Sequence, residues 1–222
     1  MIRSEADIAE ALDELLRLDP RLAAIAATAG PLPLRRLPAG LRGLLRTLMG
    51  QQVSIASADA IFARFASLVD LDDPHAILAA PEETFRAAGL SRAKQQTALA
   101  VAEAIRDGRL DLARVEAGPS PAGIAELVAV RGIGRWTAEC HLLFAAGHRD
   151  VFPAGDLALQ VAVSHALSLE GRISERALAT MAALWSPVRS AAARLFWAHY
   201  RTVTRRSAVP GAVPAGSGGA EG

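Results

Sequence analysis

The sequence predicts an all-α protein, and three observations support that prediction. Apolar residues recur three and four positions apart along most of the chain, as they do on the buried face of a helix. Helix-capping residues precede these segments, and proline or glycine separates one segment from the next. No segment shows the convincing alternation of apolar and polar residues that marks a half-buried strand. We therefore expect a domain built from many short helices.

The first third of the chain predicts helices separated by one crossing segment. Ser4 precedes a helical run and has an acidic residue three positions later, which is close to a capping box. A second, short helix is expected over 20–28. Three prolines and two glycines predict that residues 29–40 cross the surface without regular structure. Two further helices are expected over 41–49 and 55–68.

The remaining helices are predicted from their ends. Pro74 and Pro81 stand where a first helical residue belongs, and Gly89 closes the second of these segments. Ser91 caps a longer helix that is expected to end at Gly108. Further helices are expected from Ser120 to about 129, over 135–146, from Asp156 to 169, after Ser174, and from Ser186 to near 203.

Composition limits the class of protein. Hydrophobic residues make up 51% and charged residues 21% of the 222 residues, which is close to the globular average. The longest uncharged apolar stretch, 157–169, is shorter than the roughly 18 residues that a membrane span requires. The N-terminus resembles neither a signal peptide nor a transit peptide, so a cytoplasmic location is expected. Residues 1–206 are expected to fold, and 207–222 to form a disordered tail that is poor in large apolar side chains.

The reactive side chains exclude several cofactors. A single cysteine, Cys140, cannot form an internal disulfide, ligate an iron–sulfur cluster or build a cysteine-based zinc site. The five histidines lack the spacing of metal ligands, so a catalytic metal is not expected. The only lysine is Lys94, so a reaction that needs a lysine amine has one candidate.

Charge is distributed unevenly although the net charge is only +1. Residues 1–20 are acidic, whereas 176–220 contain no acidic residue and six arginines: Arg176, Arg189, Arg194, Arg201, Arg205 and Arg206. This basic end is either a solvated helix face or a surface for a polyanion.

The most informative segment is V-R-G-I-G-R-W-T-A at 130–138. Two glycines around one apolar residue allow a sharp turn, and the amides at the start of the next helix point outward together. Such a turn binds phosphate without reading base sequence, although an ordinary helix–helix turn is the alternative. The candidate phosphate-binding residues are Arg131, Gly132, Ile133, Gly134, Arg135 and Thr137.

Together with D-V-F-P-A-G-D-L at 150–157, this segment resembles the helix-hairpin-helix (HhH-GPD) DNA glycosylase superfamily. Three more blocks, at 49–54, 89–94 and 185–190, are similar to the 3-methyladenine DNA glycosylase II (AlkA-like) branch. The resemblance covers about 18–200. It implies a two-lobed helical fold, a helix-hairpin-helix at about 121–147, and an active site in the cleft between the lobes.

The resemblance implies a monofunctional enzyme that flips alkylated bases of the 3-methyladenine and 7-methylguanine type out of duplex DNA. The enzyme would hydrolyse the N-glycosidic bond and leave an abasic site for base excision repair. Asp156 would stabilise the oxocarbenium-like transition state and orient or deprotonate water; an N-cap is its alternative role, and both can hold. Members that cut the strand have a lysine where this chain has Trp136, so lyase activity is not expected.

Base-contacting residues are also implied by the resemblance. Trp136, Trp185, Cys140 and Leu157 would line the base pocket, with core packing as the alternative for either tryptophan. Cys140 and Leu157 stand where the branch often has tyrosines, which implies an open pocket and a broad range of lesions.

The polar joint between two helices would supply the residue that fills the space left by the flipped base. Gln52 matches this wedge position better than Gln51, for which helix capping is the alternative. Duplex DNA is the expected partner of a monomer that needs no obligate protein partner.

No cofactor is required by this interpretation. A structural sodium or potassium ion, held by the main-chain carbonyls of Val128, Val130 and Gly132, is compatible with the resemblance. Two other functions remain open at this point: a non-catalytic helix-hairpin-helix DNA-binding protein, and a glycosylase for mismatched or oxidised bases.

Overall fold

The computed structural model describes residues 1–207, with side chains described as far as residue 203. The described residues form helices and no strand, which confirms the all-α prediction. The helices are α1 (Glu5–Leu18), α2 (Ala23–Ala29), α3 (Gly40–Met49), α4 (Ile55–Leu68), α5 (Pro74–Ala79), α6 (Glu82–Ala88), α7 (Arg92–Arg106), α8 (Leu112–Ala117), α9 (Ser120–Val128), α10 (Arg135–His141), α11 (Leu157–Ala166), α12 (Glu175–Ala182) and α13 (Arg189–Ser207). Short turns are η1 (Pro20–Leu22), the π-helical η2 (Leu142–Ala146) and η3 (Ala183–Trp185).

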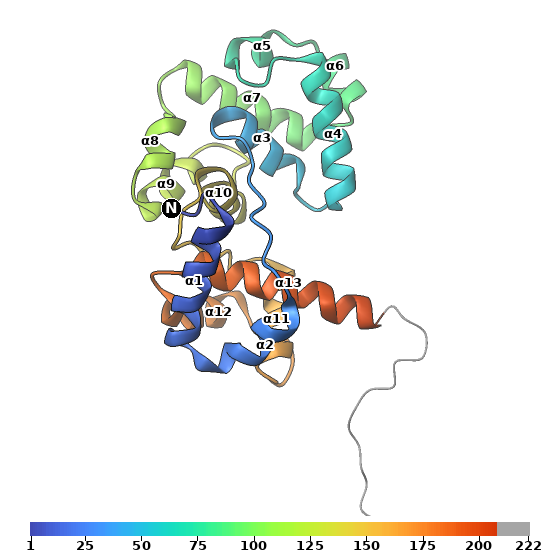
Figure 1. The fold of residues 1–222 in the computed structure, drawn as a ribbon. Coiled ribbons are helices and arrows are strands. Elements are labelled where there is room, and N and C mark those ends of the chain that lie inside the picture. The colour runs from blue at the N-terminus through green and yellow to red at the C-terminus, as the bar shows by residue number, and fades with distance from the viewer. Residues whose placement is uncertain (208–222) are drawn as a thin grey trace, which may run out of the picture.

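The helices form two lobes (Figure 1). Helices α3 to α10 make the first lobe, and α1, α2, α11, α12 and α13 make the second. Residues 30–39 carry the chain from α2 to α3, and 147–156 return it from η2 to α11. Because α13 packs against α1, α2 and α11, the two ends of the described chain close the second lobe together. The two-lobed arrangement is thus confirmed.

Local sequence accounts for most helix ends. The Ser4 hydroxyl accepts a bond from the Asp7 N–H at 3.2 Å, and the Asp7 carboxylate accepts from the Ser4 N–H at 2.9 Å, completing a capping box. Ser91 and Ser174 cap α7 and α12 through their hydroxyl groups. Gly89 ends α6 in the left-handed conformation, with φ +88°. These boundaries lie where the sequence predicts them.

Three local predictions are corrected by the structure. Helix α8, capped by Asp111, forms in a stretch where no helix was expected, because six residues are too few to show a periodic pattern. Pro81 is the N-cap of α6 and not its first helical residue. The helix expected over 135–146 is α-helical only to His141. In the π-helical turn that follows, a distant backbone group bonds to a carbonyl: the Leu37 N–H donates to the Phe144 carbonyl at 3.0 Å.

The predicted tail begins at Ser207, which is the last residue of α13, and the rest of the tail lies outside the described residues. None of the described helices is long and apolar enough to cross a membrane.

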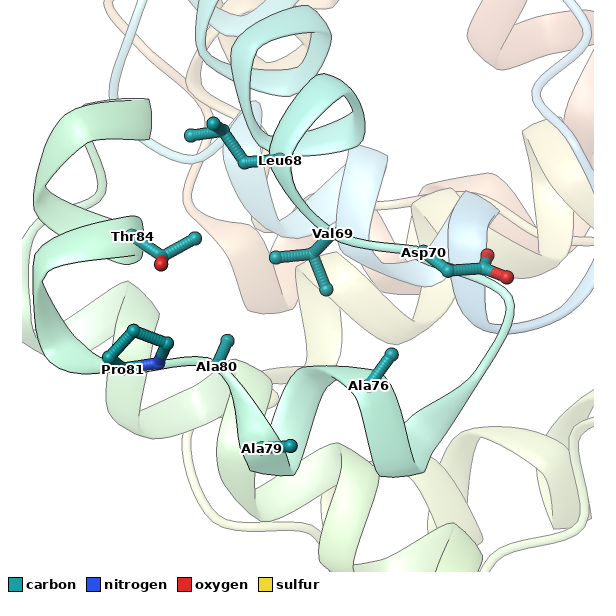
Figure 2. Close-up of a pocket in the computed structure, with 8 residues that line it drawn as sticks. All are labelled: Leu68, Val69, Asp70, Ala76, Ala79, Ala80, Pro81 and Thr84. Atoms are coloured by element: carbon teal, nitrogen blue, oxygen red, sulfur yellow. The ribbon is translucent and has the colours of Figure 1, made fainter.

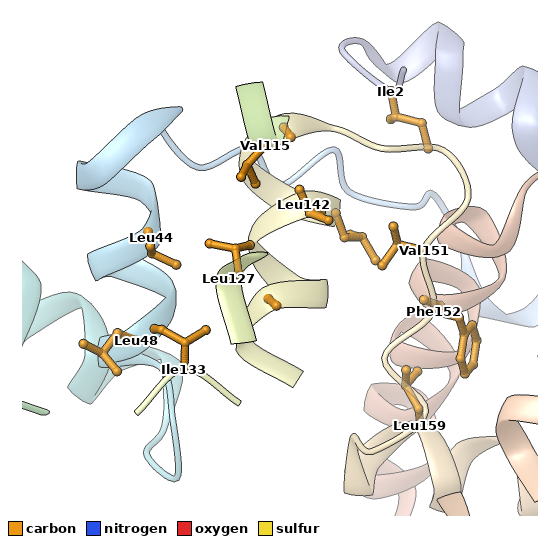
Figure 3. Packing of buried hydrophobic residues seen from close by; sticks show 14 of the residues in the cluster. Ile2, Leu44, Leu48, Val115, Leu127, Ile133, Leu142, Val151, Phe152 and Leu159 are labelled. Carbon is orange, nitrogen blue, oxygen red and sulfur yellow. The ribbon is translucent and has the colours of Figure 1, made fainter. Parts of the chain in front are cut away.

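One apolar core runs through both lobes (Figure 3). In the first lobe, Leu44 and Leu48 of α3 face Ile133, the central residue of the hairpin between α9 and α10. Ile133 is only 4% exposed, so the hairpin is anchored in the core by its own apolar side chain. The cluster continues to Phe152 and Leu159 in the second lobe. The hairpin therefore has a fixed position relative to the core.

Trp185 belongs to this core and not to a base pocket. Its side chain is fully buried, and its ring lies 5.3 Å from Phe152 and 5.1 Å from Phe196 between centroids. Its Nε1 donates to Asp19 Oδ2 at 3.0 Å. The Arg21 guanidinium, followed by this indole, holds the pKa of Asp19 below its ordinary value. Because it has no exposed surface, Trp185 cannot contact a base, and the prediction that it lines the pocket is wrong.

We expect Trp185→Phe to lower the free energy of unfolding by about 1–3 kcal/mol, because Asp19 loses a buried donor and the smaller ring leaves a void. Urea denaturation measures this change. The matched control is Leu184→Ala at the adjacent position, whose side chain is 62% exposed. We expect the control to change stability by less than about 0.5 kcal/mol. Equal losses in the two variants would contradict the buried placement of Trp185.

Candidate active site

Asp156 lies where the chain enters the second lobe, at the N-cap of α11. Its Oδ1 accepts the Leu159 N–H at 3.0 Å, so the N-cap interpretation holds. Two indoles donate to the same carboxylate. Trp136 Nε1 of α10 binds Oδ2 at 2.8 Å, and Trp197 Nε1 of α13 binds Oδ1 at 3.2 Å. Three donors from three helices thus fix the orientation of one half-buried carboxylate.

Trp197 was not among the predicted site residues. This residue is half-buried, and its ring stacks on Phe144 of η2, with centroids 5.4 Å apart and planes inclined by 27°. The Arg194 guanidinium lies over the Phe144 ring, with Cζ 5.1 Å from the ring centroid. Trp197 stands twelve residues after Trp185, outside the motif block, and the available signal was that it is the third of three tryptophans.

Cys140 and Leu157, the other two predicted pocket residues, flank Asp156 in different environments. Cys140 is 3% exposed, and burial together with the charges of Asp156 and Glu139 raises the pKa of its thiol well above the ordinary value. The thiol therefore stays protonated and is not a nucleophile. Leu157 follows Asp156 directly and is 57% exposed. The structure brings Trp136, Cys140 and Leu157 to Asp156, and leaves Trp185 in the core.

The two wedge candidates are separated by the structure. They belong to the wedge loop, residues 50–54, which joins α3 to α4. The Gln51 Nε2 donates to Thr137 Oγ1 of α10 at 2.6 Å, so this side chain connects the loop to helix α10. Gln52 is exposed and has a left-handed backbone, with φ +56°. Gln52 is therefore the residue that faces outward.

This contact also accounts for the hydroxyl of Thr137. Thr137 is 1% exposed and its hydroxyl accepts the bond from Gln51, so phosphate binding by this residue stays a prediction for its backbone N–H in the first turn of α10. The Thr137 side chain joins the wedge loop to the helix that carries Trp136.

The two hairpin glycines differ in what surrounds them. Gly132 has φ +88°, and a Cβ there would lie 2.0 Å from Thr97 Oγ1, so only glycine fits. Gly134 is the N-cap of α10, and a Cβ there would meet no protein atom within 4 Å. No protein atom therefore blocks the approach of a phosphate to Gly134. Arg131 and Arg135 are exposed on either side of the turn, whereas the Ile133 side chain points into the core.

Two of the six C-terminal arginines, Arg189 and Arg194, are bound within the fold. Arg194 is 3% exposed and donates to the main-chain carbonyls of Pro33, at 3.1 Å, and Leu34. Burial lowers its pKa to about 10. Arg189 is engaged by Asp150, with Nε 2.7 Å from Oδ1. These two arginines hold the 30–39 crossing and the 147–156 return in place.

A hollow of about 220 Å³ lies away from this site, between the end of α4 and helices α5 and α6 (Figure 2). Its lining is mostly small and apolar, and Asp70 is its one ionisable side chain. None of the predicted site residues lines it, so we assign it no chemistry.

Another buried carboxylate, Glu139, lies one residue before Cys140 and was not predicted. Arg135 Nε donates to its Oε1 at 2.8 Å across one turn of α10. Burial nevertheless raises the pKa of Glu139 to about 7, against the lowering effect of Arg135. The folded protein thus holds a proton on Glu139 at pH values where the unfolded chain has lost it.

The sign of the resulting pH dependence follows from this raised pKa. The free energy of unfolding should fall as the pH rises from 4.5 to about 7, because the unfolded state binds fewer protons in this window. We expect Glu139→Gln to remove this pH dependence. The free energy of unfolding of the variant, relative to that of the wild type, should then rise by about 1–3 kcal/mol between about pH 5 and about pH 8. Urea denaturation at both pH values tests it.

The control for this experiment is Glu82→Gln, since Glu82 is exposed and pairs only across a helix turn with Arg86. This variant should follow the wild type at both pH values. A Glu139→Gln variant that also followed the wild type would contradict the assignment.

Comparisons with known proteins identify the family of this chain. The family model described as "HhH-GPD superfamily base excision DNA repair protein" matches residues 45–190. DNA-3-methyladenine glycosylase 1 of Schizosaccharomyces pombe is 30% identical over 158 residues, covering 69% of each chain. The alkylbase DNA glycosidase-like protein mag2 of the same yeast is 24% identical and covers 87% of this chain and 94% of its own.

Solved structures with the same fold include two 3-methyladenine enzymes. The S. pombe 3-methyladenine DNA glycosylase Mag1 in complex with abasic DNA has a TM-score of 0.77 and 28% identity, covering 85% of this chain and 95% of its own. The DNA-3-methyladenine glycosidase of Bacillus halodurans has a TM-score of 0.75 and 30% identity, covering 88% and 91%. The chain belongs to the HhH-GPD superfamily of base excision DNA repair proteins.

Proposed function

We propose that this protein is a monofunctional DNA glycosylase that hydrolyses the N-glycosidic bond of alkylated bases in duplex DNA and leaves an abasic site. The observation that carries the proposal is the Asp156 carboxylate, which two indoles and one backbone amide hold in a fixed orientation. The S. pombe and B. halodurans relatives are named for 3-methyladenine, which supports an alkylated base as the substrate.

One carboxylate is sufficient for this chemistry. Alkylation of a purine ring nitrogen makes the base cationic, so it departs with the electron pair of the glycosidic bond without needing a strong acid catalyst. The negative charge of Asp156 stabilises the oxocarbenium character that develops on the sugar. A lone pair of the carboxylate then accepts a proton from the water that attacks the sugar carbon. The products are the free base and an abasic site.

The two half-buried indoles at Asp156 supply the surface for the base. Their Nε1 edges bind the carboxylate, and Phe144 covers one face of Trp197. We infer that the remaining ring surface of Trp136 and Trp197 stacks on the flipped cationic base. The small Cys140 and exposed Leu157 leave space around it, which favours a broad range of alkylpurines, including 3-methyladenine and 7-methylguanine.

Duplex DNA would be engaged by the hairpin and the wedge loop. The hairpin amides around Gly134, with Arg131 and Arg135 beside them, suit a phosphate and carry no base specificity. Gln52 would fill the space that the flipped base leaves. We place the protein with the DNA in the cytoplasm, acting as a monomer without an obligate protein partner.

A structural monovalent cation would assist the hairpin without entering the chemistry. Main-chain carbonyls of Val128, Val130 and Gly132 would hold it. The Val130 carbonyl also accepts the Ile133 N–H at 3.1 Å, which leaves one of its lone pairs for an ion.

Replacing Asp156 tests the proposal directly. Asp156→Asn keeps the shape and one acceptor but loses the charge, so base release from methylated duplex DNA should slow at least about 100-fold while DNA binding persists. Free bases are quantified by chromatography. The matched control is Asp73→Asn, because Asp73 is also a helix N-cap, accepting the His75 N–H at 2.8 Å at the start of α5, but lies in another part of the fold. The control should release bases at the wild-type rate.

Two results would overturn the proposal. Near-normal release by Asp156→Asn would remove this carboxylate from the mechanism. Binding of DNA without base release by the wild type would identify a non-catalytic DNA-binding protein.

The monofunctional assignment has its own test. A strand-cutting enzyme forms a Schiff base between a lysine and the sugar, but Trp136 occupies the position of that lysine. The only lysine, Lys94, donates to two main-chain carbonyls elsewhere in the first lobe. We therefore expect borohydride, added during turnover, to trap no covalent protein–DNA product on a denaturing gel, with a known glycosylase/lyase trapped in parallel. A trapped band would show that this enzyme also has lyase chemistry.

A further inference from the structure

The wedge loop is held at its base by contacts within the first lobe. The Gly50 N–H donates to the Thr47 carbonyl at 3.0 Å, and the Gln51 N–H donates to the Leu48 carbonyl at 3.2 Å. Arg46 of α3 and Asp59 of α4 form an ion pair that links the two helices flanking the loop. The loop residues beyond Gln51 are exposed, so their conformation depends on what fixes the preceding backbone.

Gln52 occupies a backbone region that favours glycine. Its φ of +56° lies in the left-handed region, where the Cβ of any residue other than glycine is crowded by the backbone. Such a conformation persists when neighbouring contacts determine it. The residue that sequence and exposure identify as the wedge is therefore the residue that needs external support.

Lys94 supplies a contact at this point. Its side chain reaches from the first turn of α7 to the end of α3, where Nζ donates to the Met49 carbonyl at 2.9 Å and to the Gln51 carbonyl at 3.0 Å. Both carbonyls belong to the last turn of α3 or its extension, where backbone acceptors lack helical partners and a positive charge is favourable. The Gln51 carbonyl belongs to the peptide bond that leads directly into Gln52.

We propose that Lys94 is a positioning residue for the wedge: its ammonium group fixes the backbone of residues 49–51 so that Gln52 is presented to the duplex in its left-handed conformation. The inference rests on the proposed function, because it takes Gln52 as the group that fills the space left by a flipped base. It assigns the single lysine of the chain to base flipping and not to bond cleavage.

The first experiment compares two substrates under single-turnover conditions. Lys94→Met keeps the length of the side chain but removes the ammonium group. We expect it to slow base release from a fully paired alkylated duplex about tenfold. Release should slow less than about twofold when the lesion lies opposite an abasic site, because flipping then costs little. Equal slowing on both substrates would indicate a general structural or catalytic role and overturn the proposal, as would wild-type rates on both.

The second experiment measures insertion of the wedge residue into the duplex and does not depend on base release. A duplex with an abasic-site analogue opposite 2-aminopurine reports insertion of the wedge as a change in fluorescence. Lys94→Met should lower this change at saturating protein, and Lys94→Arg should restore it, because a guanidinium also has donors for two carbonyls. Unchanged fluorescence in Lys94→Met would overturn the proposal. This result is independent of catalysis, so an inactive wild type would refute the proposed function and leave the role of Lys94 testable.

Arg92→Met is the matched control for charge. Arg92 is exposed, lies in the same turn of α7 and carries the same charge as Lys94. If loss of positive charge near the DNA were sufficient, Arg92→Met would reproduce the substrate-dependent defect of Lys94→Met and overturn the proposal. We expect Arg92→Met to affect paired and abasic-opposed substrates alike.

Discussion

The hydrogen bonds of the Asp156 carboxylate are the constraint on which the rest of the site depends. Asp156 caps a helix of the second lobe, yet Trp136, one of its donors, comes from the first lobe. The carboxylate therefore keeps its orientation only while the two lobes keep their relative position. This requirement explains why the hairpin before Trp136 is anchored through Ile133 in a core that continues into the second lobe. Packing of the two lobes thus fixes the positions of the groups that bind this carboxylate.

A second group of contacts supports the other indole donor. Trp197 stacks on Phe144, and the buried Arg194 lies over that ring while it binds the carbonyls of the 30–39 crossing. Burial of a guanidinium costs free energy, which carbonyl bonds and the aromatic ring offset here. The same crossing segment bonds to the Phe144 carbonyl through Leu37. Direct contacts thus join Trp197 to the π-helical turn η2 and to the 30–39 crossing.

The helices could be predicted because their ends are local events. A serine or aspartate at an N-cap, or a glycine in the left-handed conformation at a helix end, bonds to backbone groups within four residues of itself. Ser4, Ser91 and Gly89 are examples. Helix α8 was missed because its stability comes from burying Leu112 and Val115 against other helices, which leaves little local pattern. The π-helical turn after His141 was also missed; its Phe144 carbonyl accepts the N–H of Leu37, a partner about a hundred residues away that no local pattern indicates.

The sequence by itself determined the all-α class, the hairpin with its two glycines, and the aspartate that caps α11, since each is written in neighbouring residues. Only the tertiary structure decided which tryptophans meet that aspartate. Trp185 and Trp197 lie on the same stretch of chain and differ little in local context, but one is enclosed by Phe152 and Phe196 and the other points to Asp156. The structure likewise separated Gln51, bound to Thr137, from the exposed Gln52. Side-chain partners that are distant in sequence depend on the packing of whole helices, which no local pattern records.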